Sequence, residues 1–141
     1  MQKTQILMMV GILMAISSCA ITELMSENDG SCPDAPKCVS SQVSDPRHFI
    51  EPYTFDDQPA EAMLRLKGAL LSEKRVTIIT EQSTYLRAEV RSLIFRFVDV
   101  VEFTLLPEQG LVHIRSSARI GYTDFGVNRR RVERIRQLFQ K

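Results

Sequence analysis

The sequence predicts an α+β domain in which one four-stranded antiparallel sheet carries two helices on one face. Three observations support this class. Two segments repeat apolar residues at helical spacing, and four segments between them alternate apolar with polar residues. The connections between these segments are short, which favours antiparallel neighbours. The 141 residues, 44% of them hydrophobic, suffice for one domain with a modest core.

Residues 1–18 have the pattern of a secretory signal peptide. Lys3 precedes an uncharged run of eleven residues, Ile6–Ile16, whereas a membrane-spanning helix needs roughly 20 apolar residues. Two serines and Cys19 follow this run. The segment ISSC resembles the lipobox of bacterial lipoproteins. In that family the cysteine thiol is lipidated, the peptide is cut before the cysteine, and the new amine is acylated.

This resemblance implies that Cys19 is the first residue of the mature protein and carries a membrane anchor of fatty acids such as palmitate. An ordinary cleavable signal peptide and a short uncleaved anchor are the alternatives. In the same family an Asp after the cysteine favours the inner membrane, so Ala20 favours the outer one. The expected location is the cell envelope, with the membrane as a partner and the domain facing the periplasm.

Residues 19–31 form the expected flexible tether, which is polar toward its end and closed by Gly30. Its twelve residues after the cysteine reach about 20 Å. The next segment, Cys32 to Tyr53, is rich in turn residues and shows no sustained period, so an ordered coil is expected. A single globular domain is therefore expected over residues 32–141.

The stretch SCPDAPKCVSSQ holds Cys32 and Cys38, the two thiols that remain once Cys19 is lipidated. Outside the cytosol such a pair persists as a disulfide, and closing this loop stabilises the fold by about 2 kcal/mol. A free or regulatory pair is the alternative. Zinc binding is not favoured, because the spacing of the two cysteines differs from that of zinc-binding knuckles. Redox catalysis is not favoured either, because Pro33 and Pro36 prevent the helix that usually follows a C-x-x-C motif. We expect a structural disulfide that pins the coil.

Helices flank the series of strands. The first is expected over residues 56–72, capped by Asp56 or Asp57, and the last over residues 128–140, capped by Asn128. Their inward-facing residues are expected to be Ala62, Met63, Leu66, Ala69 and Leu70 in the first helix and Val132, Ile135 and Phe139 in the last, with Leu138 beside them.

Strands are expected over residues 75–81, 84–92, 97–106 and 111–120, with a hairpin turn at Pro107–Gly110. Alternation along the strands places one set of apolar side chains toward the core. These are Leu86, Ala88, Val90, Phe97, Val101, Phe103, Leu105, Val112, Ile114, Ala118 and Ile120.

The other face of the sheet gathers polar and ionisable side chains. They are Arg87, Glu89, Arg91, Glu102, Thr104, His113, Arg115, Ser117 and Arg119. One interpretation is a solvated face with cross-strand Arg–Glu pairs, each contributing about 0.2–1 kcal/mol. The other is a binding surface for an anionic ligand or partner, because guanidinium groups match carboxylates and phosphates with two hydrogen bonds. All of these residues except Thr104 are candidate ligand-binding residues.

Charge is distributed unevenly along the chain. Residues 20–110 carry nine Lys or Arg and fifteen Asp or Glu, a net of −6, whereas residues 111–141 carry eight and two, a net of +6. Arg129–Arg131, the arginine triplet, falls in the first turn of the last helix, where the helix dipole disfavours positive charge. Either acids of the chain or an external anion should pair with it. Asp124, Asn128 and the triplet are further candidate ligand-binding residues.

The residues available for catalysis are few. There are two histidines, His48 and His113, and no nucleophile-elbow, phosphate-loop or metal-ligand motif, so no cofactor or metal is expected. Asp45 with His48, or His113 with Ser117, could be combined into a catalytic dyad, but no motif in the sequence supports either pair. Asp99 lies on the apolar side of its strand and needs a partner, most simply a C-terminal arginine. Nucleic acid is not an expected partner, because aromatic platforms for bases are absent.

Two stretches resemble a known family. CPDAPKCVSSQ, and YLRAEVRSLIFRFVDVVEF followed by VHIRSSARIGYTDFGVNRRRVERIR, are similar in order and spacing to the uncharacterised bacterial and plastid family catalogued as domain of unknown function 1499. The resemblance covers residues 32–136. Its members are often exported lipoproteins or membrane-tethered, and no activity is established for the family. Lys37 is a departure, since the family often has Asn there. The resemblance implies recurrent residues at Cys32, Pro33, Pro36, Cys38, Ser40, Arg87, Glu89, Arg96, Phe97, Asp99, Glu102, Arg115, Ser117, Arg119, Gly121, Tyr122, Asp124, Gly126, Asn128 and Arg129–Arg131.

We therefore expect a lipid-anchored envelope protein whose domain is a non-catalytic binding module for an anionic ligand or partner of the envelope. The Arg-rich sheet face is the expected contact surface. A small hydrolase-like enzyme and a purely structural envelope lipoprotein are the alternatives. In the full expected architecture, the sheet and its two helices are preceded by a disulfide-pinned coil and a lipidated tether.

Overall fold

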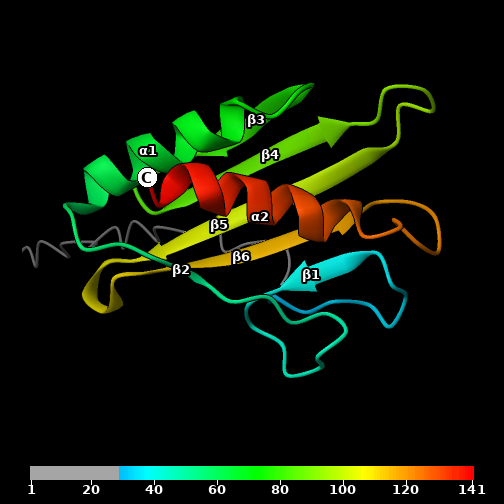
Figure 1. Ribbon diagram of the computed structural model, residues 1–141, viewed down its shortest axis with the longest axis horizontal. Helices are drawn as coiled ribbons and strands as arrows, with labels where there is room; N and C mark the ends of the chain where they lie inside the picture. The colour runs from blue at the N-terminus through cyan, green and yellow to red at the C-terminus, as the bar shows by residue number, and fades with distance from the viewer. Residues whose placement is uncertain (1–28) are drawn as a thin grey trace, which may run out of the picture.

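The computed structural model describes residues 29–141 as an antiparallel sheet with helices on one face (Figure 1). This part of the chain holds six strands and two α-helices. In chain order they are β1 (Cys38–Ser40), β2 (Tyr53–Thr54), α1 (Pro59–Leu71), β3 (Val76–Glu81), β4 (Tyr85–Arg91), β5 (Val98–Leu106), β6 (Leu111–Ala118) and α2 (Val127–Phe139). The predicted α+β class is confirmed, but the predicted strand number of four is wrong.

The two additional strands, β1 and β2, lie in the segment expected to be coil. Both pair with the same edge of β6, β1 opposite Arg115–Ser117 and β2 opposite Leu111–Val112. The strand order is β1-β6-β5-β4-β3, and all paired strands are antiparallel. Three and two residues are too few to show an alternating pattern, and main-chain hydrogen bonds form whatever the side chains are.

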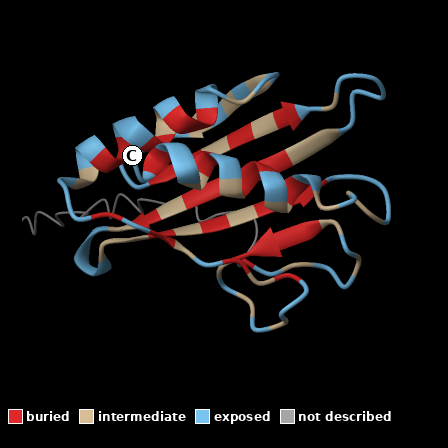
Figure 2. Cartoon of the chain, viewed as in Figure 1, coloured by how far each residue is buried: buried red, intermediate tan, exposed pale blue. Residues whose placement is uncertain are grey.

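The hydrophobic core lies between the sheet and both helices, where buried residues cluster (Figure 2). Val101 and Phe103 of β5 are fully buried there, as the alternation of that strand predicted. Tyr53 of β2 joins the sheet to α2. Its hydroxyl donates to the carbonyl oxygen of Val132 at 2.5 Å, and its ring stacks on Phe139 with the centroids 5.5 Å apart. The short strand β2 is therefore part of the core.

Helix α1 begins at Pro59 without either of its predicted caps. Gln58 precedes it in an extended conformation and makes no side-chain bond to the helix. The Asp57 carboxylate instead pairs with the Arg65 guanidinium at 2.9 Å. An ion pair with a side chain of the helix thus takes the place of the expected hydrogen bond to its backbone, and Pro59 suits the first helical position because it lacks an N–H.

Helix α2 begins at Val127, so the predicted cap Asn128 is wrong. Gly126 precedes the helix at φ +75°, and Asn128 lies inside it, fully buried. Asp124 supplies the capping hydrogen bonds, since its carboxylate accepts from the backbone N–H groups of Gly126 at 2.9 Å and Asn128 at 3.1 Å. The buried Asn128 side chain is in turn bonded to the Ser116 hydroxyl at 2.5 Å.

Two residues predicted to face the core lie outside the sheet. Phe97 precedes β5 and is 48% exposed, and Ile120 follows β6 and is 56% exposed. The chain has left the sheet at both points, so strand alternation no longer sets the direction of these side chains. Leu138, expected beside the inward face of the last helix, is also exposed.

The predicted hairpin connects β5 with β6 through a short 3₁₀ turn, Pro107–Gln109, which ends at Gly110 with φ +62°. A Cβ at Gly110 would lie 2.6 Å from the carbonyl oxygen of Phe55, so only glycine fits. The Phe55 N–H donates to the Gly110 carbonyl oxygen at 2.9 Å. The hairpin therefore closes against the segment that leads from β2 to α1.

Candidate functional site

Cys32 and Cys38 form a disulfide, as predicted. Residues 32–38 are called the disulfide ring below. Cys38 belongs to β1 and lies opposite Ser117, so the ring is held against the end of β6. The Lys37 carbonyl oxygen also accepts from the Ala118 N–H at 3.0 Å, which extends the pairing of β1 with β6.

The predicted polar residues share the sheet face opposite the helices, called the polar face below. The register places Arg87, Glu102 and Arg115 side by side across β4, β5 and β6. The neighbouring row carries Glu89 of β4 and Ser117 of β6. Residues directly opposite one another in antiparallel strands point to the same side, so this face collects its charges from three strands.

Two carboxylates of the polar face are paired within the chain. Glu102, only 3% exposed, accepts from the Tyr85 hydroxyl at 2.7 Å and from Arg115 at 3.3 Å. Glu89 accepts from Arg119 at 2.5 Å. The first interpretation of this face, cross-strand pairing of arginine with glutamate, is therefore observed.

A pocket of about 300 Å³ opens on the polar face between the disulfide ring and strands β4–β6. Of its described lining residues four are basic and none is acidic, and it is called the basic pocket below. Four predicted ligand-binding residues contribute to it. The lining is Pro33, Lys37, Arg87, Val100, Arg115, Ser117, Ala118 and Arg119.

Sequence reasoning missed Pro33 and Lys37 as residues of this pocket. Both belong to the disulfide ring, which is distant in sequence from the strands and reaches them only through the pairing of β1 with β6. The one available signal was Lys37 itself, a basic residue between two cysteines. Its ammonium group makes no ion pair with a residue of the described range.

His113 lies on the polar face and is partly buried. Its Nδ1 is 3.0 Å from the Ser41 hydroxyl oxygen, which itself accepts from the Ile114 N–H at 2.9 Å. The Ser41 hydroxyl can donate either to His113 Nδ1 or to the Ile114 carbonyl oxygen, which lies 3.5 Å away. Burial lowers the pKa of His113 from its ordinary value of 6.5. The partner of His113 is Ser41, so the dyad drawn with Ser117 is not formed.

The second dyad, Asp45 with His48, is not formed either. The Asp45 carboxylate binds the Arg47 guanidinium at 2.6 Å, and these hydrogen bonds lower the pKa of Asp45 to about 2. The buried His48 ring bonds through Nδ1 to the Cys38 carbonyl oxygen at 2.9 Å. His48 therefore contacts the last residue of the disulfide ring.

The arginine triplet is divided among several acceptors of the chain. Arg129 donates to the carbonyl oxygens of Phe49 at 2.8 Å and Arg47 at 3.1 Å. Arg130 donates to the carbonyl oxygen of Phe125 at 2.9 Å. These contacts account for arginines in the first turn of α2, where the helix dipole disfavours them.

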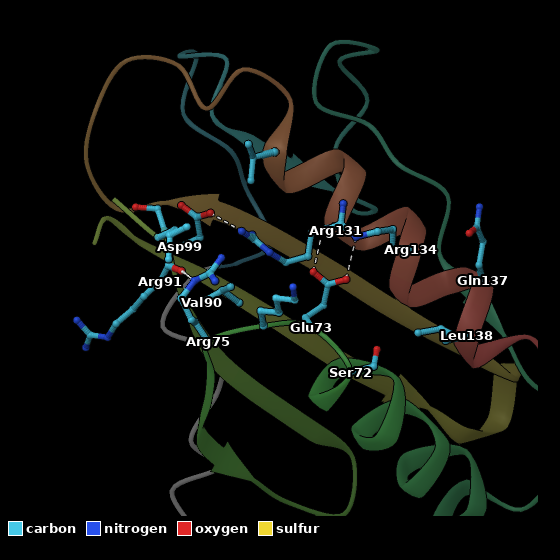
Figure 3. A pocket seen from close by; sticks show the side chains of 14 residues that line it. Ser72, Glu73, Arg75, Val90, Arg91, Asp99, Arg131, Arg134, Gln137 and Leu138 are labelled. Atoms are coloured by element: carbon cyan, nitrogen blue, oxygen red, sulfur yellow. Dashed lines mark hydrogen bonds and ion pairs between the residues drawn. The ribbon is translucent and has the colours of Figure 1, made fainter. Parts of the chain in front are cut away.

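Arg131, the third member, is buried and forms an ion pair with the partly buried Asp99 at 2.6 Å, which confirms the predicted partner of Asp99. The pair lines a groove of about 740 Å³ between α2, the α1–β3 connection and the end of β4 (Figure 3). Arg134 and Glu73 pair at 2.7 Å elsewhere along the same groove. Arg91, predicted for the polar face, lines this groove as well.

The candidate ligand-binding residues do not form one site. Asp99 points toward the helices, whereas Glu102, three residues along β5, points to the polar face. Asp124, Asn128 and the arginine triplet accordingly lie on the helix side. Only the polar-face residues meet at the basic pocket.

The predicted signal peptide and the predicted lipidation site, Cys19, lie outside the described residues. Within residues 29–141, no group of three or more His, Cys, Asp or Glu side chains is arranged to hold a metal ion. Neither helix in that range has the length and apolar character that crossing a bilayer requires.

The family model described as "Protein of unknown function (DUF1499)" matches residues 30–139. The chain belongs to the DUF1499 family. The match includes the disulfide ring, every strand and both helices of the described range, so the basic pocket lies wholly inside the DUF1499 domain. Among curated proteins, none matches the sequence.

The Arg131–Asp99 ion pair predicts unequal roles for neighbouring arginines of the DUF1499 domain. Arg131→Met should lower the free energy of unfolding by about 1–3 kcal/mol, because it leaves the partly buried Asp99 carboxylate without its partner. Arg130→Met is the matched control. It removes an exposed side chain and should stay within about 0.5 kcal/mol of the parent. Urea denaturation measures both, and equal losses would contradict the structural role of Arg131.

The lowered pKa of His113 predicts a dependence of stability on pH. The unfolded chain binds this proton more readily than the folded domain, so stability falls as the pH drops below 6.5. Above that value His113 is neutral in both states and contributes nothing to the slope. Urea midpoints between about pH 8 and about pH 5 should fall less for His113→Gln than for the parent. Parallel curves for the two proteins would show that His113 is not responsible.

Proposed function

We propose that this DUF1499 protein is a lipid-anchored envelope protein that binds an anionic group, a phosphate or a carboxylate, in the basic pocket. The observation that carries the proposal is the composition of that pocket, whose described lining has four basic residues and no acid. A solvated sheet face with balanced pairs would not need such a concentration of one charge. The binding itself is non-catalytic.

The chemistry of the lining suits an oxyanion. Guanidinium groups present a planar fork of N–H donors that matches two oxygens of a carboxylate or phosphate. Arg115 and Arg119 are held in place by Glu102 and Glu89, so their orientation exists before a ligand arrives. Lys37 adds a point charge from the disulfide ring, and the Ser117 hydroxyl of the lining can act as a further donor.

The size of the pocket limits the ligand. A volume of about 300 Å³ is at the lower end for ligand pockets, which run from roughly 300 to 1,000 Å³. It fits a small anion or the charged head of a larger molecule. A free phosphate, a lipid headgroup and a carboxylate of another envelope component share this chemistry.

The lipid anchor is supported by the leader sequence and by the position of the domain's first residues. The Ser31 carbonyl oxygen accepts from Arg115 at 2.7 Å, and the Gly30 carbonyl oxygen accepts from the Ser40 hydroxyl at 2.6 Å. The chain thus enters the domain beside the basic pocket. Nine residues separate Cys19 from the described range, and as a flexible tether they would reach about 16 Å, so an anchor at Cys19 would keep the pocket close to the membrane surface.

Two alternatives have less support. For the hydrolase-like enzyme, neither candidate dyad is formed within the described residues. His113 contacts Ser41, and His48 contacts the Cys38 carbonyl oxygen. The purely structural protein would have many internal arginine–acid pairs, which are indeed found. Such a protein would not require a basic pocket, and the pocket therefore favours binding.

Lys37 provides the test of anion binding. Inorganic phosphate should shift the backbone amide signals of residues 115–119 in a saturable way when titrated into the parent and followed by NMR. Lys37→Gln should weaken this binding by about tenfold or more, since it removes one charge-assisted contact. Lys74→Gln, at an exposed lysine outside the basic pocket, is the matched control and should leave the affinity unchanged.

Three probes distinguish the sources of the anion. Glycerol phosphate stands for a lipid headgroup, inorganic phosphate for the free ion and succinate for a carboxylate partner. Saturable binding of any one of them that depends on Lys37 supports the proposal and names the class. No saturable binding of any probe, or equal binding by Lys37→Gln and the parent, would refute it.

The lipid anchor predicts a definite mass. Protein extracted from the membrane of its own cells should lack residues 1–18 and carry the added mass of fatty acyl groups on Cys19. Cys19→Ser should remain uncut and unacylated. Intact-mass spectrometry measures both, and a parent protein with a free Cys19 thiol would disprove lipidation without affecting the test of the pocket.

A further inference from the structure

Two loops lie side by side at one end of the sheet (Figure 1). Residues 92–97 connect β4 with β5, and residues 119–126 connect β6 with α2. Asp99 of β5 is paired with Ala118 of β6, and the Arg119 N–H donates to the Val98 carbonyl oxygen at 3.0 Å. The sheet therefore fixes the two loops next to each other, and they are called the tip loops below.

The tip loops carry several exposed apolar side chains, and Figure 2 colours most of both loops as exposed. Their most exposed side chains are Leu93 at 71%, Ile94 at 79%, Phe95 at 72%, Ile120 at 56%, Tyr122 at 75% and Phe125 at 82%. Single exposed apolar residues are ordinary, whereas a cluster of this kind marks an interaction surface. None of the six belongs to the hydrophobic core cluster of the described residues.

The backbone of both loops is built to hold these side chains outward. Arg96 and Phe125 have φ angles of +54° and +53°, a region that residues with a side chain rarely adopt. The Ser92 hydroxyl accepts from the Phe97 N–H at 2.9 Å and closes the first loop. Asp124 braces the second loop through the Gly126 N–H. The exposure therefore results from an ordered conformation.

Basic residues predominate around the tip loops. Arg96 lies within the first loop, Arg91 precedes it, and Arg119 begins the second. Arg91 and Arg119 both pair with Glu89, at 3.4 and 2.5 Å, and Asp124 accepts hydrogen bonds from the start of α2. Arg96 therefore borders the apolar side chains without an ion pair to a residue of the described range.

We propose that the tip loops dock onto a bilayer surface that carries anionic lipid headgroups. Apolar and aromatic side chains next to arginines are the composition that enters the headgroup region, with the apolar groups below the phosphates and the cations at their level. A second copy of this chain fits less well. A two-fold symmetric contact would bring Arg96 of both copies into one interface, while Asp124, the acid of the loop sequences, is engaged at the start of α2.

This docking goes beyond anion binding in the basic pocket and does not rest on it. The pocket lies on the polar face, and the tip loops are the connections at the end of the sheet. They share Arg119, but neither the apolar side chains of the tip loops nor Arg96 line the pocket. Docking also differs from lipidation, since an acyl anchor holds the chain to a membrane without setting the orientation of the domain. Contact through the tip loops would set it.

A tryptophan reporter tests the proposal. The chain has no tryptophan, so Phe95→Trp places a single reporter in the first tip loop. Leu64→Trp, at a residue of α1 that is 62% exposed and away from the tip loops, is the matched control. The full chain of each variant is reconstituted in vesicles of phosphatidylcholine with phosphatidylglycerol, so the leader or anchor acts equally in both. Quenching by brominated acyl chains is then measured.

The Phe95→Trp protein should shift its emission to shorter wavelength and be quenched by brominated lipid, while Leu64→Trp should not. Equal quenching of the two reporters would overturn the proposal. So would a blue shift at position 95 without quenching, because it would mean that a second copy or the chain's own Ile6–Ile16 segment covers the loop.

Charge gives an independent arm of the same experiment. In the Phe95→Trp background, Arg96→Gln should lower the ratio of inserted to free loop roughly fivefold, as expected for one basic residue at an anionic surface. Replacing phosphatidylglycerol with phosphatidylcholine should act in the same direction. If neither change lowers the ratio of inserted to free loop, the tip loops do not recognise anionic headgroups.

Discussion

Strand β6 is the constraint on which the rest of the structure depends, because it is bonded along both edges. β5 pairs with one edge, while β1 and β2 share the other. With its register fixed from both sides, β6 cannot slip by a residue, and its side chains divide strictly between the two faces. Val112 and Ile114 enter the core, and His113 and Arg115 point to the polar face. The core and the basic pocket thus arise from one strand.

Two arginines of α2 attach the irregular segment between β1 and β2 to the helix. Arg129 binds carbonyl oxygens at Arg47 and Phe49, and Arg136 binds those of Glu51 and Pro52 at 2.6 and 2.9 Å. A segment without regular partners must satisfy its carbonyl groups in some other way, and a guanidinium with five donors can serve two at once. The concentration of positive charge at the end of the sequence therefore has a structural cause.

The sequence predicted the parts of the fold that repeat and missed the parts that depend on distant contacts. The helices and the four longer strands follow from their periods, and the disulfide follows from two remaining cysteines. β1 and β2 are too short for any period. Asp57 and Asn128 are residue types that commonly cap helices. In the structure Asp57 pairs with Arg65 and Asn128 is bonded to Ser116, so neither serves as the predicted cap. The position of Lys37 in the basic pocket was not predicted, because it depends on the pairing of β1 with β6.

The disulfide ring has a consequence for the thermodynamics of recognition. Lys37 sits between bonded cysteines, so the backbone of one wall of the pocket is restricted before any anion would bind. Association would then order the Lys37 side chain but not its backbone, and preorganisation of this kind tightens complexes without adding contacts. A reductant that opens the bridge would return that freedom to the wall. The affinity proposed for the basic pocket would thereby be coupled to the thiol–disulfide balance of the surroundings.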